Sequence, residues 1–433
     1  MTHNARPGSF KERFKTVLLN SLPPFDRFVA KGELEEWDAG VRSRQSAILD
    51  IRRHLDRTGH SILIPIIGDI GSGKTHFLWT IKNSFEIDEF ASFINLPRSR
   101  EKFFYYVYGD LIEDFGADRL LEFAQEFGEK FGAAERLYGF FKTQNVREIT
   151  ANAYNILKAD FSFKEALHQC IHVLIQHILK RDTYQITERW LLGQVMEINE
   201  LFMIGVNDDL SSQKLARSML KLLIDHYYQG IVLLFDDFDK AIEEYQNLPV
   251  LHYEDEINWA TDLDPVGEKE STVEEENDKD LVEIICAMLK EMHQLKLIIT
   301  LGVDDAPLIL ERLRASVPEG TIVDPIFLDS VTLEDTLNLY LARLREFAMK
   351  NQIPHPVRDY DPDEDVLNVE SMNPNDVIFY PLNLNVIKHV HRETHGNVRA
   401  IIRNFKRLFD AVVFEDIDPE NLDERFKKFV RKY

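Results

Sequence analysis

Short apolar runs alternate with amphipathic segments along the chain, and this alternation predicts the elements and their arrangement. Three runs are continuous and end at a glycine or at acidic residues, namely 61–67, 230–235 and 295–301. Continuous apolar runs of this length are typical of strands that are buried on both faces. Two further runs, 91–96 and 322–328, predict a second and a fifth strand. Strands that alternate with helices indicate an α/β fold with a parallel five-stranded sheet covered on both faces.

Residues 100–228 show a helical pattern almost throughout. Phe123, Phe127 and Phe131 recur at i, i+4 and i+8, and a second apolar stripe lies within 174–179. Stripes at this spacing occupy one face of a helix and far more often line a protein core than a cofactor. We therefore expect a large helical insertion in the sheet domain.

The C-terminal region reads as a group of helices. Thr332 with Asp335 forms a capping-box pattern at a helix start, and two further helices, 381–395 and 398–409, are separated by Gly396-Asn397. The predicted organisation is a segment at 1–40, a core at 41–330 with an insertion at 100–228 and an acidic flexible loop at 250–280, and a helical lid at 331–433. A second acidic loop, 354–376, lies inside the lid.

Charge and composition narrow the partners. The 433-residue chain carries a formal net charge of −23, so contact with nucleic acid would require a local basic patch. Its two cysteines, Cys170 and Cys286, lack a paired spacing, which is typical of a reducing compartment. The apolar runs are far shorter than the ~20 residues of a membrane-spanning helix, and no signal peptide is apparent. We expect a cytoplasmic protein without a membrane partner.

The segment that follows the first predicted strand carries the clearest chemistry. It reads Gly68, Asp69, Ile70, Gly71, Ser72, Gly73, Lys74 and Thr75, which matches the phosphate-loop pattern G-x-x-x-x-G-K-[ST]. Glycines allow successive backbone N–H groups to point inward as an anion nest, and the following helix start also favours a phosphate. Lys74 would then contact the β- and γ-phosphates, and Thr75 would bind Mg²⁺. Because no guanine-reading Asn-Lys-x-Asp motif is present, ATP is preferred over GTP.

Four further residues are candidates for the same site. Asp236, directly after the third strand, is the second expected Mg²⁺ carboxylate, and Asp237 is the candidate base for the attacking water. Thr300 in the fourth strand and Arg399 at a helix start are candidate contacts to the γ-phosphate. A buried strand threonine and a surface arginine are the alternative interpretations of these two residues.

These motifs together resemble the AAA+ superfamily, in the branch of the archaeal and eukaryotic origin-recognition ATPases. Residues 41–44, Val-Arg-Ser-Arg, are similar to the Gly-Arg-Glu box of that branch, and residues 231–237 are similar to Walker B. Thr300 matches sensor 1, and residues 396–399, Gly-Asn-Val-Arg, match sensor 2. The resemblance implies a P-loop NTPase fold of the additional-strand class, Mg²⁺-dependent ATP hydrolysis and movement of the lid.

The chain also departs from this family. Walker B ends in Asp236-Asp237 where the family usually has Asp-Glu, so slow hydrolysis is expected. The tail after Phe409 is too short for the winged-helix domain of origin-recognition proteins. The resemblance implies an arginine finger between subunits, for which Arg312 and Arg314 are the positional candidates; a solvated helix face is the alternative interpretation of both residues. The insertion, with Trp190 in the segment 188–193, is also similar to the ATP-binding proteins of BREX-type phage-defence systems.

Three functions remain in view. The first is an ATPase that couples nucleotide binding and hydrolysis to movement of the lid and the insertion, with a protein partner or a homo-oligomer. The second is a nucleotide-gated interaction switch that hydrolyses ATP slowly or not at all, and the third is a DNA-acting ATPase. Pairs of histidines at His168/His172 and His391/His395 have helical spacing but lack further ligands, so they are interpreted as structural.

Overall fold

The computed structural model describes residues 7–25, 44–56, 59–85, 90–95, 102–133, 136–137, 140–141, 145–248, 279–359, 372–374, 376–414 and 428–431. Three predicted features fall largely outside these residues. They are the acidic loop at 250–280, of which only 279–280 are described, the second acidic loop at 354–376, of which 360–371 and 375 are not described, and positions 41–43 of the Gly-Arg-Glu-like box. Among the described residues, no helix combines the length and apolar character needed to cross a bilayer.

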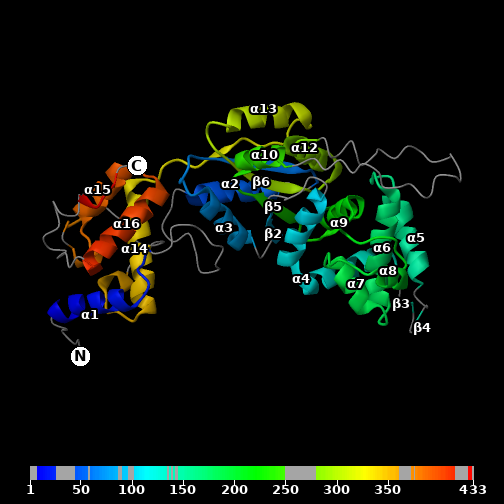
Figure 1. The fold of residues 1–433 in the computed structure, drawn as a ribbon, viewed down its shortest axis with the longest axis horizontal. Coiled ribbons are helices and arrows are strands. Elements are labelled where there is room, and N and C mark those ends of the chain that lie inside the picture. Colours follow the sequence, from blue (N-terminus) through cyan, green and yellow to red (C-terminus); the bar gives the residue numbers. More distant parts are fainter. Residues whose placement is uncertain are drawn as a thin grey trace. The chain divides into compact units, whose positions relative to one another are not determined.

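The predicted parallel sheet of five strands is confirmed (Figure 1), in the order β2-β5-β6-β1-β7. Its strands are β1 (Ile62–Ile67), β2 (Phe90–Phe93), β5 (Ile231–Phe235), β6 (Lys296–Leu301) and β7 (Ile326–Phe327). Every residue of β1 and of β5 is buried. This is why both runs lack the polar alternation of a half-exposed strand. The fifth strand is shorter than predicted, with an isolated bridge from Leu63 to Ile322 preceding it.

Helices follow or precede the strands as the pattern predicts. They are α2 (Gln45–Leu55), α3 (Lys74–Phe85), α10 (Phe238–Gln246), α12 (Leu281–Glu291) and α13 (Ala306–Ser316). Parallel neighbours require long crossover connections, and α3, α10, α12 and α13 lie in such connections between strands of the sheet, whereas α2 precedes β1. The sheet is therefore an α/β layer structure.

The helical insertion is confirmed in outline and differs in detail. It contains α4 (Phe103–Lys130), α5 (Val146–Leu157), α6 (Lys164–Leu179), α7 (Tyr184–Leu191), α8 (Ile198–Ile204) and α9 (Gln213–His226). Phe123, Phe127 and Phe131 are buried, as their spacing predicts. Trp190 is fully buried, and its Nε1 donates to the carbonyl oxygen of Asp208. The pattern did not predict the short antiparallel pair β3 (Arg136–Leu137) and β4 (Phe140–Phe141).

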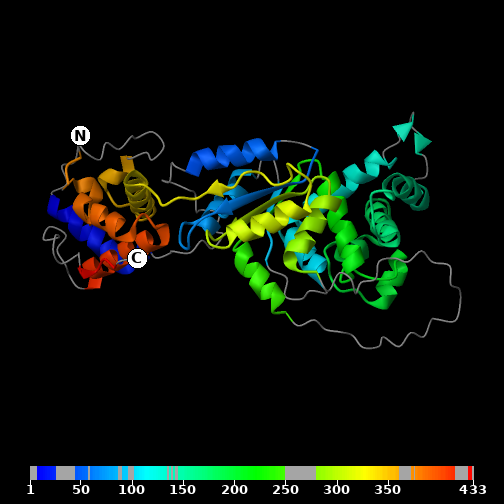
Figure 2. The same ribbon diagram turned by 90° about the horizontal axis from the view of Figure 1, so that it is seen from above.

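The C-terminal helices share one core with an N-terminal helix, as Figure 2 shows. The elements are α1 (Pro7–Asn20), α14 (Leu333–Lys350), η2 (Pro356–Asp359), η3 (Val377–Phe379), α15 (Leu384–Thr394) and α16 (Val398–Phe414). Phe14 of α1 packs edge-on against Phe347, with ring centroids 5.7 Å apart. Phe25 stacks on Tyr340 at 5.8 Å. Residues 7–25 therefore complete the lid core, a role that their sequence did not indicate.

Residue contacts divide the chain into two compact units. The first comprises Met1–Arg53, Ile66–Asn83 and Ile326–Tyr433, and the second comprises His54–Pro65 and Ser84–Pro325. The phosphate loop and the lid belong to the first unit, and the Asp236–Asp237 pair with Thr300 belongs to the second.

Candidate functional site

The phosphate loop joins the end of β1 at Ile67 to the start of α3 at Lys74. Gly71 and Gly73 have φ values of 84° and 96°, in the region that favours glycine. At Gly73 a side chain would meet nothing within 4 Å, so this glycine is required for its backbone conformation alone. The predicted order of strand, glycine turn and helix is confirmed at these residues.

Gly68 and Gly71 are also required by close packing. A Cβ at Gly68 would lie 2.5 Å from Oγ of Ser72 and 3.2 Å from Cβ of Leu328. A Cβ at Gly71 would lie 2.6 Å from Oδ1 of Asn397 and 3.1 Å from Cβ of Arg399. Separations below 3 Å cannot be kept, so a side chain at either glycine would push the loop from its neighbours.

Lys74 begins α3 and is 8% exposed. Its Nζ donates to the carbonyl oxygens of Gly68 at 2.7 Å and of Asp69 at 3.3 Å. The ammonium is therefore held under the loop by backbone carbonyls. Beside it, the hydroxyl of Ser72 is buried and has no hydrogen-bond partner within the described residues. A buried cation, an unpaired hydroxyl and a helix start around one glycine turn suit an anion with several oxygens.

Arg44 supports the loop from outside, a role that sequence reasoning missed. Its guanidinium is 6% exposed and donates to the carbonyl oxygens of Ser72 at 2.8 Å and Asp329 at 3.2 Å. It also lies 5.9 Å from the ring centroid of Phe77. Arg44 thus ties the loop to the segment that follows β7. Only its place in the box-like motif at 41–44 could have pointed to this residue.

The start of α16 contacts the phosphate loop directly. Asn397 Nδ2 donates to the carbonyl oxygen of Ile70 at 2.8 Å, and the backbone N–H of Arg399 donates to that of Gly71 at 3.2 Å. Asn397 Oδ1 accepts from the N–H of Ala400 at 3.0 Å, which is an N-cap bond. One side chain therefore caps α16 and fastens it to the loop. An asparagine directly before a helix is a sequence signal for the cap, one that sequence reasoning missed, and no local pattern signals the second contact.

Arg399 itself reaches the loop with its backbone, while its side chain is exposed. The Cβ of Arg399 lies beside Gly71, so the side chain of Arg399 leaves the backbone next to the loop. Its guanidinium makes no ion pair within the described residues. The structure thus brings Arg399 to the loop residues. Gly396, just before it, has a φ of 74°, and a side chain there would collide with the carbonyl oxygen of Val331.

The carboxylate half of the predicted site, defined here as Asp236, Asp237 and Thr300, lies at the ends of β5 and β6. Thr300 is fully buried, and its Oγ1 donates to Oδ1 of Asp236 at 2.7 Å. The backbone N–H of Asp237 donates to Thr300 Oγ1 at 2.8 Å and to Asp236 Oδ1 at 3.0 Å. The Thr300 hydroxyl thus donates its single hydrogen to the carboxylate of Asp236 and accepts a hydrogen bond from the backbone N–H of Asp237.

Asp237 occupies the left-handed region with a φ of 46°, which is uncommon for a non-glycine residue. Its carboxylate accepts a hydrogen bond from Lys240, one turn later in α10, and both side chains are largely solvent-accessible. This hydrogen bond is the main cause that raises the pKa of Lys240 above its ordinary value. The candidate base therefore carries a cationic partner on its own helix.

The other candidates lie apart from these contacts. Arg312 pairs with Asp280, whose side chain also caps α12 by accepting from the N–H of Glu283 at 2.9 Å, and Arg314 is exposed on α13. Nδ1 of His391 hydrogen-bonds Thr336 Oγ1 at 3.0 Å. The described residues contain no group of three or more His, Cys, Asp or Glu side chains that would hold a metal ion.

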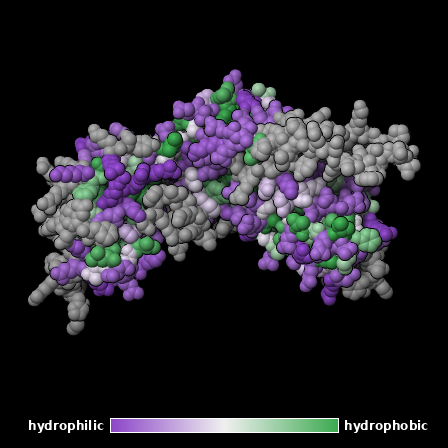
Figure 3. All heavy atoms as spheres, in the orientation of Figure 1, coloured by the Kyte–Doolittle hydropathy of each residue, from purple (hydrophilic) through white to green (hydrophobic). Residues whose placement is uncertain are grey.

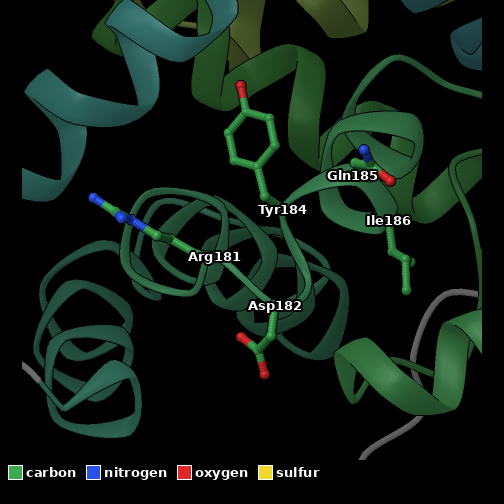
Figure 4. A pocket seen from close by; sticks show the side chains of 5 residues that line it. All are labelled: Arg181, Asp182, Tyr184, Gln185 and Ile186. Atoms are coloured by element: carbon green, nitrogen blue, oxygen red, sulfur yellow. The ribbon is translucent and has the colours of Figure 1, made fainter.

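A pocket in the insertion was not anticipated. It is lined by Arg181, Asp182, Tyr184, Gln185 and Ile186, at the start of α7. Figure 4 shows that the side chains of Arg181 and Asp182 point in different directions and do not converge on one point. The pocket contains none of the predicted site residues, so it adds nothing to the candidate site.

Comparisons with known proteins do not extend this description. No family model, no curated protein and no solved structure matches the chain.

Proposed function

We propose that this chain is an AAA+-like P-loop ATPase, which binds ATP with Mg²⁺ through residues 68–75. The observation that carries the proposal is the glycine turn at the start of α3. It combines two positive φ values with a buried Lys74 and an unpaired Ser72 hydroxyl. Backbone N–H groups at such a turn and a helix start stabilise the negative charge of phosphates.

Lys74 would supply a full positive charge to the bound phosphates. Its ammonium now bonds two carbonyl oxygens of the loop, and it has three N–H donors. A phosphate oxygen offers a charge-assisted hydrogen bond, which is about twice as strong as one to a neutral carbonyl. Lys74 would therefore turn from the carbonyls toward the β- and γ-phosphates when the triphosphate binds.

Thr75 and Asp236 would hold Mg²⁺, which prefers oxygen ligands of this kind. The ion would supply positive charge that neutralises the negative charge developing on the phosphate oxygens during transfer. Ligands of parallel α/β sheets bind outside the carboxyl ends of the strands, where Gly68 follows β1 and Asp236 follows β5. Thr300 would keep Asp236 in a fixed orientation through its 2.7 Å hydrogen bond.

Asp237 would orient the attacking water and accept its proton. Arg399 would contact the γ-phosphate, and Asn397 would hold the start of α16 to the loop, so that loop changes reach the lid. The same contacts favour ATP over ADP, because only ATP carries the γ-phosphate that Arg399 would reach.

A second candidate is a nucleotide-gated interaction switch with little hydrolysis. The hydrogen bond from Lys240 to Asp237 favours it, because the Asp237 oxygen that accepts from Lys240 is then less available to an attacking water. Phosphate release at saturating ATP separates the two functions. A silent parent with an active Asp237→Glu variant supports the switch, and steady turnover by the parent supports the ATPase.

The test of nucleotide binding is Lys74→Ala, with Lys82→Ala further along α3 as the matched control. We expect the Lys74 variant to lose about 100-fold in affinity for a fluorescent ATP analogue with Mg²⁺, and the control to keep its affinity. Unlabelled ATP should compete better than GTP. Equal affinity of the parent and the Lys74 variant would refute the proposal.

A further inference from the structure

The exposed side of α16 carries a row of arginines. Arg399, Arg403 and Arg407 recur at i, i+4 and i+8, so they form one ridge along the helix. Arg403 is exposed and Arg407 is half-buried. The opposite side of the helix, with Ile401, Phe405 and Leu408, is fully buried in the lid core. The ridge begins at the phosphate loop and leads away from it along the helix.

A fourth arginine is held against this ridge by a buried amide. Asn404 is 2% exposed, and its Nδ2 donates to the carbonyl oxygen of Arg431 at 3.2 Å. Its Oδ1 accepts from the N–H of Arg431 at 3.0 Å. Two hydrogen bonds from one buried side chain thus position the backbone of Arg431 beside α16. Phe429 packs against the lid core on the same segment.

The arginine cluster, defined here as Arg403, Arg407 and Arg431, has no acidic partner within the described residues. Burial lowers the pKa of Arg407, and the nearby charges of Arg431 and Arg403 lower it further. Like charges four residues apart on a helix repel one another. Their grouping is notable in a chain with a formal net charge of −23, in which acidic partners are abundant.

The surroundings of the cluster favour phosphate over a protein partner. Among the side chains that the structure describes at 398–412 and 428–431, no large apolar one is exposed, whereas protein interfaces have an apolar centre. Figure 3 shows that hydrophilic residues gather over α15 and α16 on the face in view. Single-stranded nucleic acid is bound through exposed aromatic rings, and the described side chains at 398–412 and 428–431 include no exposed aromatic ring. Arginines that contact only phosphates are typical of duplex binding.

We propose that Arg403, Arg407 and Arg431 bind the phosphate backbone of a nucleic-acid duplex. This site is distinct from the ATP site and goes beyond the proposed function. The row from Arg399 to Arg407 would place the duplex at one end of the helix whose other end contacts the phosphate loop. An effect of the duplex on ATP hydrolysis would rest on the proposed function, whereas duplex binding does not.

The experiment measures fluorescence anisotropy of a labelled DNA duplex of about 30 base pairs with the full chain, without nucleotide, from ~50 to ~200 mM salt. The variant is Arg403→Gln, Arg407→Gln and Arg431→Gln combined. The matched control replaces Arg53, Lys158 and Arg181, all exposed, by glutamine and changes the net charge equally. A lysine version of the cluster preserves the charge, and thermal unfolding checks the fold of every variant.

We expect the glutamine variant to lose at least about tenfold in affinity at low salt. The slope of log K against log salt should become shallower by about 2 to 3. The control and the lysine version should keep the parent's slope. An RNA duplex of equal length reports which duplex is preferred, and either preference supports the proposal. Lys74→Ala should bind the duplex like the parent, which separates this test from that of ATP binding.

Three results would overturn the proposal. The first is a parent that does not bind either duplex at low salt, and the second is a glutamine variant whose affinity and slope match the parent's. The third is that single-stranded DNA, or a peptide with the acidic sequence 266–280, binds the parent more tightly than the duplex does and loses affinity when the three arginines are replaced. The last outcome would assign the cluster to the chain's own acidic segment.

Discussion

The phosphate loop and the carboxylate half are built by different means. The loop is held by backbone geometry, since its carbonyl oxygens accept from Lys74, Arg44 and Asn397. The carboxylate half is held by side-chain contacts, with the Thr300 hydroxyl between Asp236 and the N–H of Asp237. A backbone site is sensitive to any added Cβ, and a side-chain site is sensitive to the loss of one hydroxyl. Substitutions in the two halves should therefore fail in different ways.

The largest effect is expected at Gly71. Gly71→Val combines a φ of 84° with a collision against Asn397, so we expect about 100-fold weaker ATP binding or more. Gly320→Val is the control, because Gly320 has a φ of 85° and open space around its Cα. The control should lose ~1–2 kcal/mol of unfolding free energy and keep its nucleotide affinity. Comparable ATP binding by Gly71→Val and the parent would contradict the packing argument.

Thr300→Val tests the carboxylate half without changing its shape. Loss of the hydroxyl leaves Asp236, which is partly buried, with one donor fewer, so we expect ~1–3 kcal/mol lower unfolding free energy. Phosphate release should fall about tenfold, while affinity for ATP without Mg²⁺ stays unchanged. Thr300→Ser restores the hydroxyl and should recover turnover. A valine variant with the parent's turnover would show that Thr300 does not position Asp236.

Asn397→Asp separates the two roles of Asn397. Aspartate still caps α16 by accepting from Ala400, but it cannot donate to the carbonyl oxygen of Ile70. We expect about fivefold weaker ATP binding with little change in melting temperature. Asn397→Ala removes both bonds and should also lose ~1 kcal/mol of unfolding free energy. Unchanged ATP affinity in the aspartate variant would show that the lid contact does not support the loop.

The smallest effect is expected at Lys240. Lys240→Gln replaces the ammonium by a neutral amide, which is a weaker donor to Asp237. The Asp237 oxygen is then more often free for water, so phosphate release should rise about two- to threefold if Asp237 acts as the base. The pair is largely exposed, and the unfolding free energy should change by less than ~0.5 kcal/mol. Glu243→Gln, on the same helix, is the control. A fall in turnover would indicate that Lys240 itself supports the reaction.

The sequence pattern predicted most helices and strands of this protein correctly, but it did not predict which of them pack against one another. The strands at 61–67 and 230–235 were predictable because a buried parallel strand is apolar at every position. The N-terminal helix was not, because Phe14 and Phe25 have partners more than 300 residues away in the lid core. The same holds for Arg44, since nothing near it in sequence indicates contact with Ser72 and Asp329.

By itself, the amino-acid sequence determined the parallel sheet, the glycine turn and its lysine, because these depend on local periodicity and on backbone freedom at single positions. Only the tertiary structure decided that Thr300 binds Asp236, that Asn397 bonds the loop, and that Arg431 joins the α16 arginines. Each of these contacts joins residues far apart in the chain. Their distance is set by how the elements pack, and no local pattern encodes it.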